Sequence, residues 1–228
     1  MRRLTLLILL LVLSVNAPGC KRKSISLSND ELRILKEIGF DVEMAKYAER
    51  YLADSFYQFQ TSNPGYIVKD GKQQKTGIKK QNGISWKVGS ESIDPVIKAL
   101  KTDLKEKGYL IFVSEQGYGK SPSEMTIIKS TDQFDILRIQ NTDGINYDLE
   151  NADVIRRLEE WNNKYGIEVI GADYDWVEIS ILRPPPDIEG FAKEVYEFCP
   201  DAVDQGVGTI TALESEIRDK SRLFLWWD

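Results

Sequence analysis

"IEVIGADYDWVEISIL", residues 167–182, indicates two short β-strands joined by a tight turn. Beyond the turn, Val177, Ile179 and Ile181 occupy every second position, and polar side chains lie between them. This period of two is typical of a strand that buries one face and exposes the other. The four-residue link "ADYD" is short and polar, so the two strands are predicted to form a hairpin.

Amphipathic helices are predicted on both sides of this hairpin. Residues 151–165 carry apolar side chains at steps of three and four, as a helix with one buried face does. Another helix is expected to begin at the capping residue Asp187 and to carry an apolar stripe as far as Cys199. Thr211 and Glu214 have the spacing of a capping box, which predicts a short last helix.

The rest of the chain mixes helical and strand-like periodicity in the same way. Asp70-Gly71 and Asn82-Gly83 are turn dipeptides between strand-like residues, and each predicts a hairpin in a lysine-rich stretch. Together these patterns predict an α+β fold, with a mixed, mostly antiparallel sheet packed by amphipathic helices. The remaining predicted elements are helices over 28–38, 44–59 and 94–108, and strands over 109–113, 125–129 and 222–228.

The first 19 residues have the pattern of a secretory signal peptide, with a basic start, an apolar run and a small-residue cleavage region. The apolar run is shorter than the roughly 20 residues that a membrane-spanning helix needs. Residues 17–20, "APGC", resemble the bacterial lipobox, although Ala17 stands where that pattern prefers leucine. Ordinary signal peptidase cleavage after Gly19 is the alternative, and either route leaves Cys20 first. We expect acylation of Cys20, by diacylglycerol and palmitate-type chains, and a membrane-anchored lipoprotein of the bacterial cell envelope.

This processing divides the chain into four parts. We predict a signal peptide over 1–19, a lipid-anchored tether over 20–28, a helical segment with a basic hairpin region over 29–90, and an α+β domain over 91–228. The chain has two cysteines, so acylation of the first leaves one thiol and permits no intramolecular disulfide. The folded part must then be stabilised by its hydrophobic core, for which it is long enough.

Charge is distributed unevenly along the chain. Residues 20–130 hold 19 Lys and Arg against 14 Asp and Glu, whereas residues 131–228 hold 9 against 22, a net charge of −13. An acidic C-terminal half argues against nucleic acid, which selects clustered basic side chains. It suits a basic protein partner, although a solvated acidic surface is the simpler interpretation.

The chain contains no histidine, and this excludes several kinds of active site. Ser-His-Asp and Cys-His nucleophile systems and histidine-ligated zinc sites are all ruled out. Any catalysis would depend on carboxylates, Lys, Tyr, Ser or Cys199. The sequence assigns no catalytic residue, cofactor or metal ligand.

From about residue 91 the chain resembles a bacterial family, the domain of unknown function numbered 4253. The motifs that carry the resemblance are, in order, "NTDGINYDL" (141–149), "VIGADYDWVEI" (169–179), "CPDAVDQGVGT" (199–209) and the terminal "LWWD" (225–228). The resemblance implies a domain of typical length without an established activity, so it supplies no catalytic residues.

The segment "CPDAVDQGVGT" supplies the candidate site. Cys199 falls on the apolar face of its helix and is expected to be a buried side chain, not a nucleophile. The turn that follows it can account for the aspartates and glycines by local hydrogen bonds and backbone freedom. The candidate functional surface nevertheless consists of Asp201, Asp204, Gln205, Trp227 and Asp228.

Two functions follow from these observations. The preferred one is a lipoprotein that binds proteins, either as an immunity-like module against a basic effector or as a scaffold in the envelope. The alternative is a carboxylate- or metal-dependent hydrolase in which Asp201, Asp204 and Asp228 converge. Whether the protein is an enzyme is left open, with the balance against catalysis.

Overall fold

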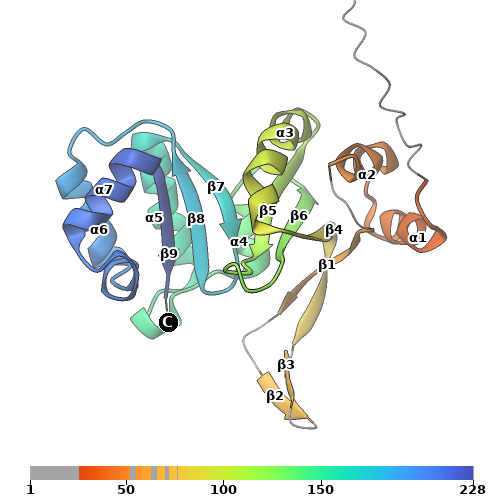
Figure 1. Ribbon diagram of the computed structural model, residues 1–228, viewed down its shortest axis with the longest axis horizontal. Helices are drawn as coiled ribbons and strands as arrows, with labels where there is room; N and C mark the ends of the chain where they lie inside the picture. The colour runs from red at the N-terminus through yellow and green to blue at the C-terminus, as the bar shows by residue number, and fades with distance from the viewer. Residues whose placement is uncertain (1–25, 52–54, 63–65, 70–71, 76, 228) are drawn as a thin grey trace, which may run out of the picture.

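The computed structural model describes residues 26–51, 55–62, 66–69, 72–75 and 77–227. In this part of the chain seven strands form one sheet in the order β1-β4-β6-β5-β7-β8-β9, and β2 and β3 form a separate ribbon (Figure 1). Every neighbouring pair that the structure describes is antiparallel except β5 and β7, which meet at Val113 and Gly171. The predicted α+β class and the mostly antiparallel sheet are thus confirmed. The strands are β1 (Tyr57–Ser62), β2 (Tyr66–Lys69), β3 (Lys72–Lys75), β4 (Ile78–Val88), β5 (Tyr109–Glu115), β6 (Ser123–Lys129), β7 (Ile167–Ala172), β8 (Trp176–Ile181) and β9 (Arg222–Trp226).

Helices pack on both faces of the sheet, and each face has its own hydrophobic core. One core joins the sheet to α4 (Asp135–Gln140), α5 (Asn151–Tyr165), α6 (Ile188–Phe198) and α7 (Ile210–Lys220). The other joins it to α1 (Asn29–Ile38), α2 (Val42–Glu49) and α3 (Ile93–Glu106). This arrangement explains why the central strands bury residues of both alternating sets.

The hairpin predicted over 167–182 is confirmed. Strands β7 and β8 pair antiparallel, with Ile167 opposite Ile181. Val177, Ile179 and Ile181 all lie in the core beneath α5 and α6, as their alternation predicts. β9 then pairs antiparallel with β8 and becomes the last strand of the sheet.

The helix predicted over 44–59 ends early, because the chain changes from helical to strand periodicity. α2 ends at Glu49, and β1 begins at Tyr57. Phe59 is fully buried within β1, where Gln58 on one side of it pairs with Ile84 of β4 and Gln60 on the other with Lys80, so this segment is a strand of the sheet. The aromatic stripe that suggested one helix therefore belongs to a helix followed by a strand.

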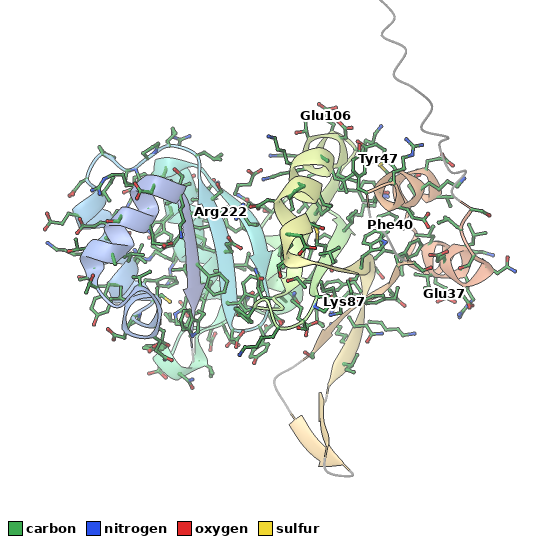
Figure 2. All side chains as sticks on the ribbon, viewed as in Figure 1. Glu37, Phe40, Tyr47, Lys87, Glu106 and Arg222 are labelled. Carbon is green, nitrogen blue, oxygen red and sulfur yellow. The ribbon has the colours of Figure 1, made fainter. Side chains whose placement is uncertain are left out.

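The N-terminal helices are fixed to the sheet and to α3 by contacts of Phe40 and Tyr47, two residues that Figure 2 labels. The ring of Phe40, between α1 and α2, lies 4.8 Å from the ring of Tyr109 at the start of β5. The Tyr47 hydroxyl of α2 donates a hydrogen bond to Asp103 of α3. These contacts seat α1 and α2 beside α3.

The hairpin predicted at Asn82-Gly83 is wrong, because β4 runs through both residues without a turn. Gly83 permits a close approach of strands: a Cβ there would lie 2.9 Å from the carbonyl oxygen of Ile127. The hairpin predicted at Asp70-Gly71 is supported by the pairing of Lys69 with Lys72, and the two turn residues lie outside the described residues.

The boundary predicted near residue 90 does not separate two sheets. β4, which precedes it, pairs with β6, which follows it, in an unbroken register from Gly83 opposite Ile128 to Val88 opposite Ser123. The last helix starts after the capping residue Thr209 instead of Thr211, because the Thr209 hydroxyl accepts from the amide of Ala212.

The predicted signal peptide, Cys20 and most of the tether lie outside the described residues. Among the helices that the structure does describe, none combines the length and the apolar character needed to cross a bilayer.

Candidate functional site: the meeting point of four motifs

The four sequence motifs meet at one end of the sheet, where β7 turns into β8 and where β9 ends. The loop after α4 contacts the hairpin tip through two hydrogen bonds: the Thr142 hydroxyl donates to the carbonyl of Asp173 (2.7 Å), and the amide of Asp143 donates to that of Tyr174 (2.8 Å). The amide of Trp227 donates to the carbonyl of Asp175 (3.0 Å). Segments more than 50 residues apart in the chain thus form one structural unit.

Trp227 is the centre of this unit. Its side chain is only 3% exposed, and its ring packs edge-on against the ring of Phe198 at 5.5 Å. The indole N–H donates to the carbonyl of Phe198 (3.3 Å). A Cβ at Gly144 would lie 2.9 Å from the indole, so glycine there makes room for the ring. Trp227 was predicted to lie on a functional surface, and the structure places it in the core instead.

Cys199 is buried, as its position on the helix predicts. It is 0% exposed, and its Sγ donates a hydrogen bond to the carbonyl of Trp226 (3.1 Å). Burial raises the pKa of the Cys199 thiol to about 12, so the thiol carries its proton at neutral pH. The contact also anchors the edge strand β9 to the end of α6.

The two aspartates of "CPDAVDQGVGT" have different partners. Asp201 is 3% exposed and accepts hydrogen bonds from the Gln205 amide (2.9 Å) and from the Tyr147 hydroxyl. Asp204 is exposed and faces the Tyr196 hydroxyl at 3.3 Å. Tyr147 donates a hydrogen bond from its hydroxyl to Asp201. Because this bond favours the protonated phenol, it raises the pKa of Tyr147 to about 12.

Asp204 and Gln205 lie in a π-helical turn, Ala202–Val207, which Asp201 precedes and Gly208 closes at φ 84°. Turns of this kind are rare and occur often at functional sites. Of the predicted surface, Asp204 and Gln205 are exposed and Asp201 is buried. Asp228 lies outside the described residues. Among the residues that are described, no three acidic or cysteine side chains are grouped as a metal site requires.

Next to this turn lies an aromatic groove that the sequence reasoning did not identify. Its volume is about 310 Å³, and its lining consists of four rings and one carboxylate, from Tyr118, Asp175, Trp176, Phe224 and Trp226. The ring planes of Trp176 and Phe224 are stacked, with centroids 5.3 Å apart and 15° between the planes. The Trp226 ring follows at 6.1 Å from Phe224. The sequence feature that could have indicated this groove is the alternation in β9, which places Phe224 and Trp226 on the face opposite Leu225.

Tyr118 reaches the groove from the loop between β5 and β6. It has a left-handed backbone, with φ 48°, and its side chain is 66% exposed. For a bulky residue this conformation costs of order 1 kcal/mol, and residues strained in this way often cluster at functional sites. Gly117 permits the tight loop, because a Cβ there would lie 1.9 Å from the carbonyl oxygen of Ser121. Burial and the nearby charges of Asp175 and Asp173 raise the pKa of Tyr118.

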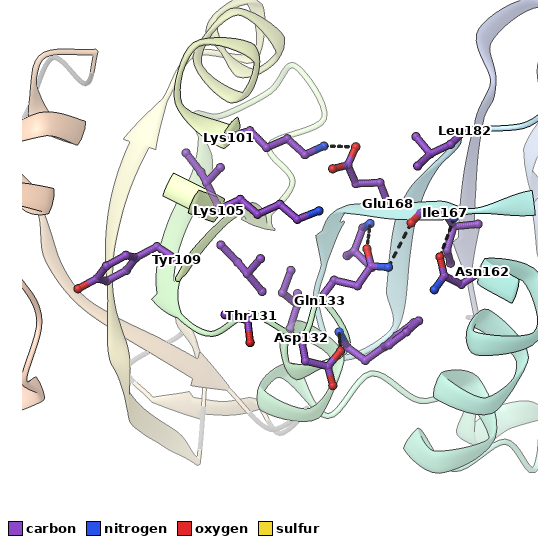
Figure 3. A pocket seen from close by; sticks show the side chains of 15 residues that line it. Lys101, Lys105, Tyr109, Thr131, Asp132, Gln133, Asn162, Ile167, Glu168 and Leu182 are labelled. Atoms are coloured by element: carbon purple, nitrogen blue, oxygen red, sulfur yellow. Dashed lines mark hydrogen bonds and ion pairs between the residues drawn. The ribbon is translucent and has the colours of Figure 1, made fainter. Parts of the chain in front are cut away.

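A larger cavity of about 400 Å³ lies where β5 and β7 separate (Figure 3). Lys101 of α3 forms an ion pair across it with Glu168 of β7. The Gln133 side chain replaces a missing strand partner, since its amide donates to the carbonyl of Ile167 (3.1 Å) and its oxygen accepts from the amide of Val169 (2.9 Å). The cavity is thus the gap between β5 and β7, and the Lys101–Glu168 ion pair and the Gln133 hydrogen bonds bridge it.

A third hollow, of about 150 Å³, is lined in part by the buried acidic residue Glu124. Its carboxylate accepts from the Ser114 hydroxyl (2.7 Å) and the Tyr57 hydroxyl (2.5 Å), and Lys87 lies 3.5 Å away. Both oxygens are therefore occupied by partners within the protein. This network joins β1, β4, β5 and β6.

Comparison with protein-family models gives a match over the C-terminal part of the chain. The family model described as "Domain of unknown function (DUF4253)" matches residues 124–228, which include all four motifs. No curated protein and no solved structure matches the chain. The predicted family resemblance is confirmed, and the matched region begins within β6 instead of near residue 91.

Proposed function

Residues 124–228 of this chain belong to the DUF4253 family, and on that premise we propose that the protein is a lipid-anchored binding module of the bacterial envelope. Its ligand is a protein with a basic surface, which it holds as an immunity-like inhibitor or as a scaffold. The family description names no activity, so the proposal depends on the residues of this chain.

The observation that carries the proposal is the character of the end where the four motifs meet. Asp204 and Gln205 are exposed there, beside Tyr147, which is 36% exposed, and Ile145, which is 70% exposed. Tyrosine and large apolar side chains are enriched in protein interfaces, and carboxylates around them steer a partner of opposite charge. The net charge of −13 over residues 131–228 extends this attraction beyond the contact itself.

The structural elements beneath this surface support a binding role more directly than a catalytic one. The buried carboxylate of Asp201 accepts hydrogen bonds from Tyr147 and Gln205. Cys199 is buried and protonated at neutral pH. What remains accessible is a rigid surface of aromatic, amide and carboxylate groups.

The binding proposal is tested by capture from bacterial envelope extracts at low and high salt. The purified chain should retain a basic protein that is released as salt is raised, because salt screens attraction between exposed charges. Asp204→Lys should weaken capture. Asp219→Lys, at an exposed position near the end of α7, makes the same charge change away from the motifs and should not. A capture that is insensitive to salt, or equal for both variants, would contradict the proposal.

The anchor is tested separately through Cys20. Cys20→Ser should move the protein from the membrane fraction to the soluble fraction, because the acylated cysteine supplies the lipid attachment. Metabolic labelling with a palmitate analogue should mark the unchanged chain and not this variant. Retention of Cys20→Ser in membranes would show that the protein is held there by another route.

A further inference from the structure

The groove described above presents aromatic rings and a carboxylate together. The lining residues are Tyr118, Asp175, Trp176, Phe224 and Trp226. The faces of aromatic rings carry negative partial charge, and among the described residues the remaining lining group is the Asp175 carboxylate. We infer that this groove binds an organic ammonium group, and that its natural occupant is a lysine side chain of the basic partner. The identity of the occupant rests on the proposed function, whereas the recognition chemistry rests on the groove alone.

The rings lie side by side because of the strand register. Trp176 of β8 is directly opposite Trp226 of β9, and Glu178 is opposite Phe224, so three rings occupy adjacent positions on one face. The other face of the same strands, with Val177 and Leu225, is fully buried in the core. Phe224 and Trp226 are left partly exposed, although rings of this size are the groups that most favour burial.

Helix α3 contacts this face of the sheet at the start of β9, which is the end away from the hairpin tip. Arg222, at the start of β9, pairs with Asp94 in the first turn of α3 at 2.6 Å, and Glu178 pairs with the same arginine at 3.3 Å (Figure 2). Toward the hairpin tip, where Trp226 lies, the groove begins. The fold thus leaves Phe224 and Trp226 partly exposed at the end where the family motifs converge, above the buried ring of Trp176.

Two features favour a cation over an apolar ligand. Asp175 lines the groove, and Asp173 lies close enough for both charges to affect the Tyr118 hydroxyl. Lys120, which follows in the same loop, is exposed and does not line the groove. Ammonium groups placed over several aromatic faces, with a carboxylate nearby, are bound by cation–π attraction and charge together.

The groove is also contiguous with the π-helical turn. A Cβ on Gly206 would lie 3.4 Å from the ring of Trp226, so the turn forms one side of that tryptophan's surroundings. Cys199 holds the backbone of Trp226 from below through its Sγ hydrogen bond. A partner that contacts Asp204 and Gln205 could therefore place a basic side chain in the groove at the same time.

The test uses choline and its neutral isostere 3,3-dimethylbutan-1-ol, which has the same shape without the charge. Each is titrated into the purified full-length chain at constant ionic strength, and binding is followed by tryptophan fluorescence and by the indole N–H signals in NMR spectra. Choline should produce a saturable change and the isostere should not. Nα-acetyl-lysine methylamide should bind to the same site and compete with choline.

Variants locate the binding in the groove. Trp226→Leu should weaken choline binding about ten-fold or more, as loss of a desolvated cation–π contact does. Trp226→Phe should keep most of it, and Asp175→Asn should weaken it while leaving the rings in place. Tyr51→Leu removes a ring from the turn after α2, where Tyr51 is 44% exposed and far from the groove in sequence, and this change should have no effect.

The outcomes separate this inference from the proposed function. Equal binding of choline and its isostere, or binding that Trp226→Leu leaves unchanged, would overturn the ammonium site. Choline binding that depends on Trp226, in a protein that captures no basic partner, would keep the site and refute the proposed function. Capture of a basic partner by a chain that does not bind choline would support the proposed function and refute the ammonium site.

Discussion

Trp226 and Trp227 are neighbours in the sequence, and truncation of each should have a different effect. Trp227 is 3% exposed and fills the core, where its removal takes away a ring contact with Phe198 and leaves that residue's carbonyl without its indole donor. Replacing a buried Phe or Trp with alanine costs about 3–5 kcal/mol. Trp227→Ala is therefore expected to lower the free energy of unfolding by about 4 kcal/mol, a large part of the roughly 5–15 kcal/mol of a typical domain.

Trp226 is partly exposed: its ring lines the groove and also packs against the edge of the second core. Trp226→Ala is expected to cost about 1–2 kcal/mol, less than Trp227→Ala, because part of the Trp226 ring is already exposed to water. Urea unfolding followed by circular dichroism measures both values. If the two variants lost equal stability, or if Trp226→Ala lost more, the assignment of one ring to the core and the other to a binding groove would be refuted.

Three further predictions concern single groups. In a Cys20→Ser background, Cys199 should resist Ellman's reagent at pH 8 until the protein unfolds. Because its folded pKa of about 12 lies above that of a free thiol, the stability it contributes should fall as pH rises from about 9 toward 12. Asp201→Asn should lower the pKa of Tyr147 from about 12 toward 10, which ultraviolet titration against Tyr147→Phe would detect; an unchanged pKa would mean that another group holds it. Gln133→Leu should cost about 1–3 kcal/mol in urea unfolding and speed amide exchange at Val169, because two β7 backbone groups lose their partner; a change of a few tenths would mean that water replaces the side chain.

Local pattern was sufficient for many of the elements. The hairpin 167–182 and the helix 151–165 follow from period-two and period-3.6 spacing, which depends on neighbours only a few residues away. The same reasoning was wrong where two interpretations fitted a short segment. The aromatic residues after Glu49 matched a helical stripe, and Asn82-Gly83 matched a turn, until pairing with other strands decided otherwise.

The candidate site was found from sequence only in part. Its segments could be recognised as motifs, and the burial of Cys199 followed from its place on the helix. The aromatic groove could not be found, because it combines Tyr118, Asp175 and Trp226 from three distant parts of the chain. No spacing rule connects residues that are joined only by the packing of separate loops and strands.

The sequence by itself determined the α+β class, most helix and strand positions, the uneven charge and the absence of histidine chemistry. Only the tertiary structure decided the strand order, the single described parallel contact of β5 with β7, and the face on which each terminal tryptophan lies. Alternation in β9 required Trp226 and Trp227 to point in opposite directions. Which of the two entered the core depended on the pairing of β9 with β8 and on the space that Gly144 leaves, both of which are long-range contacts.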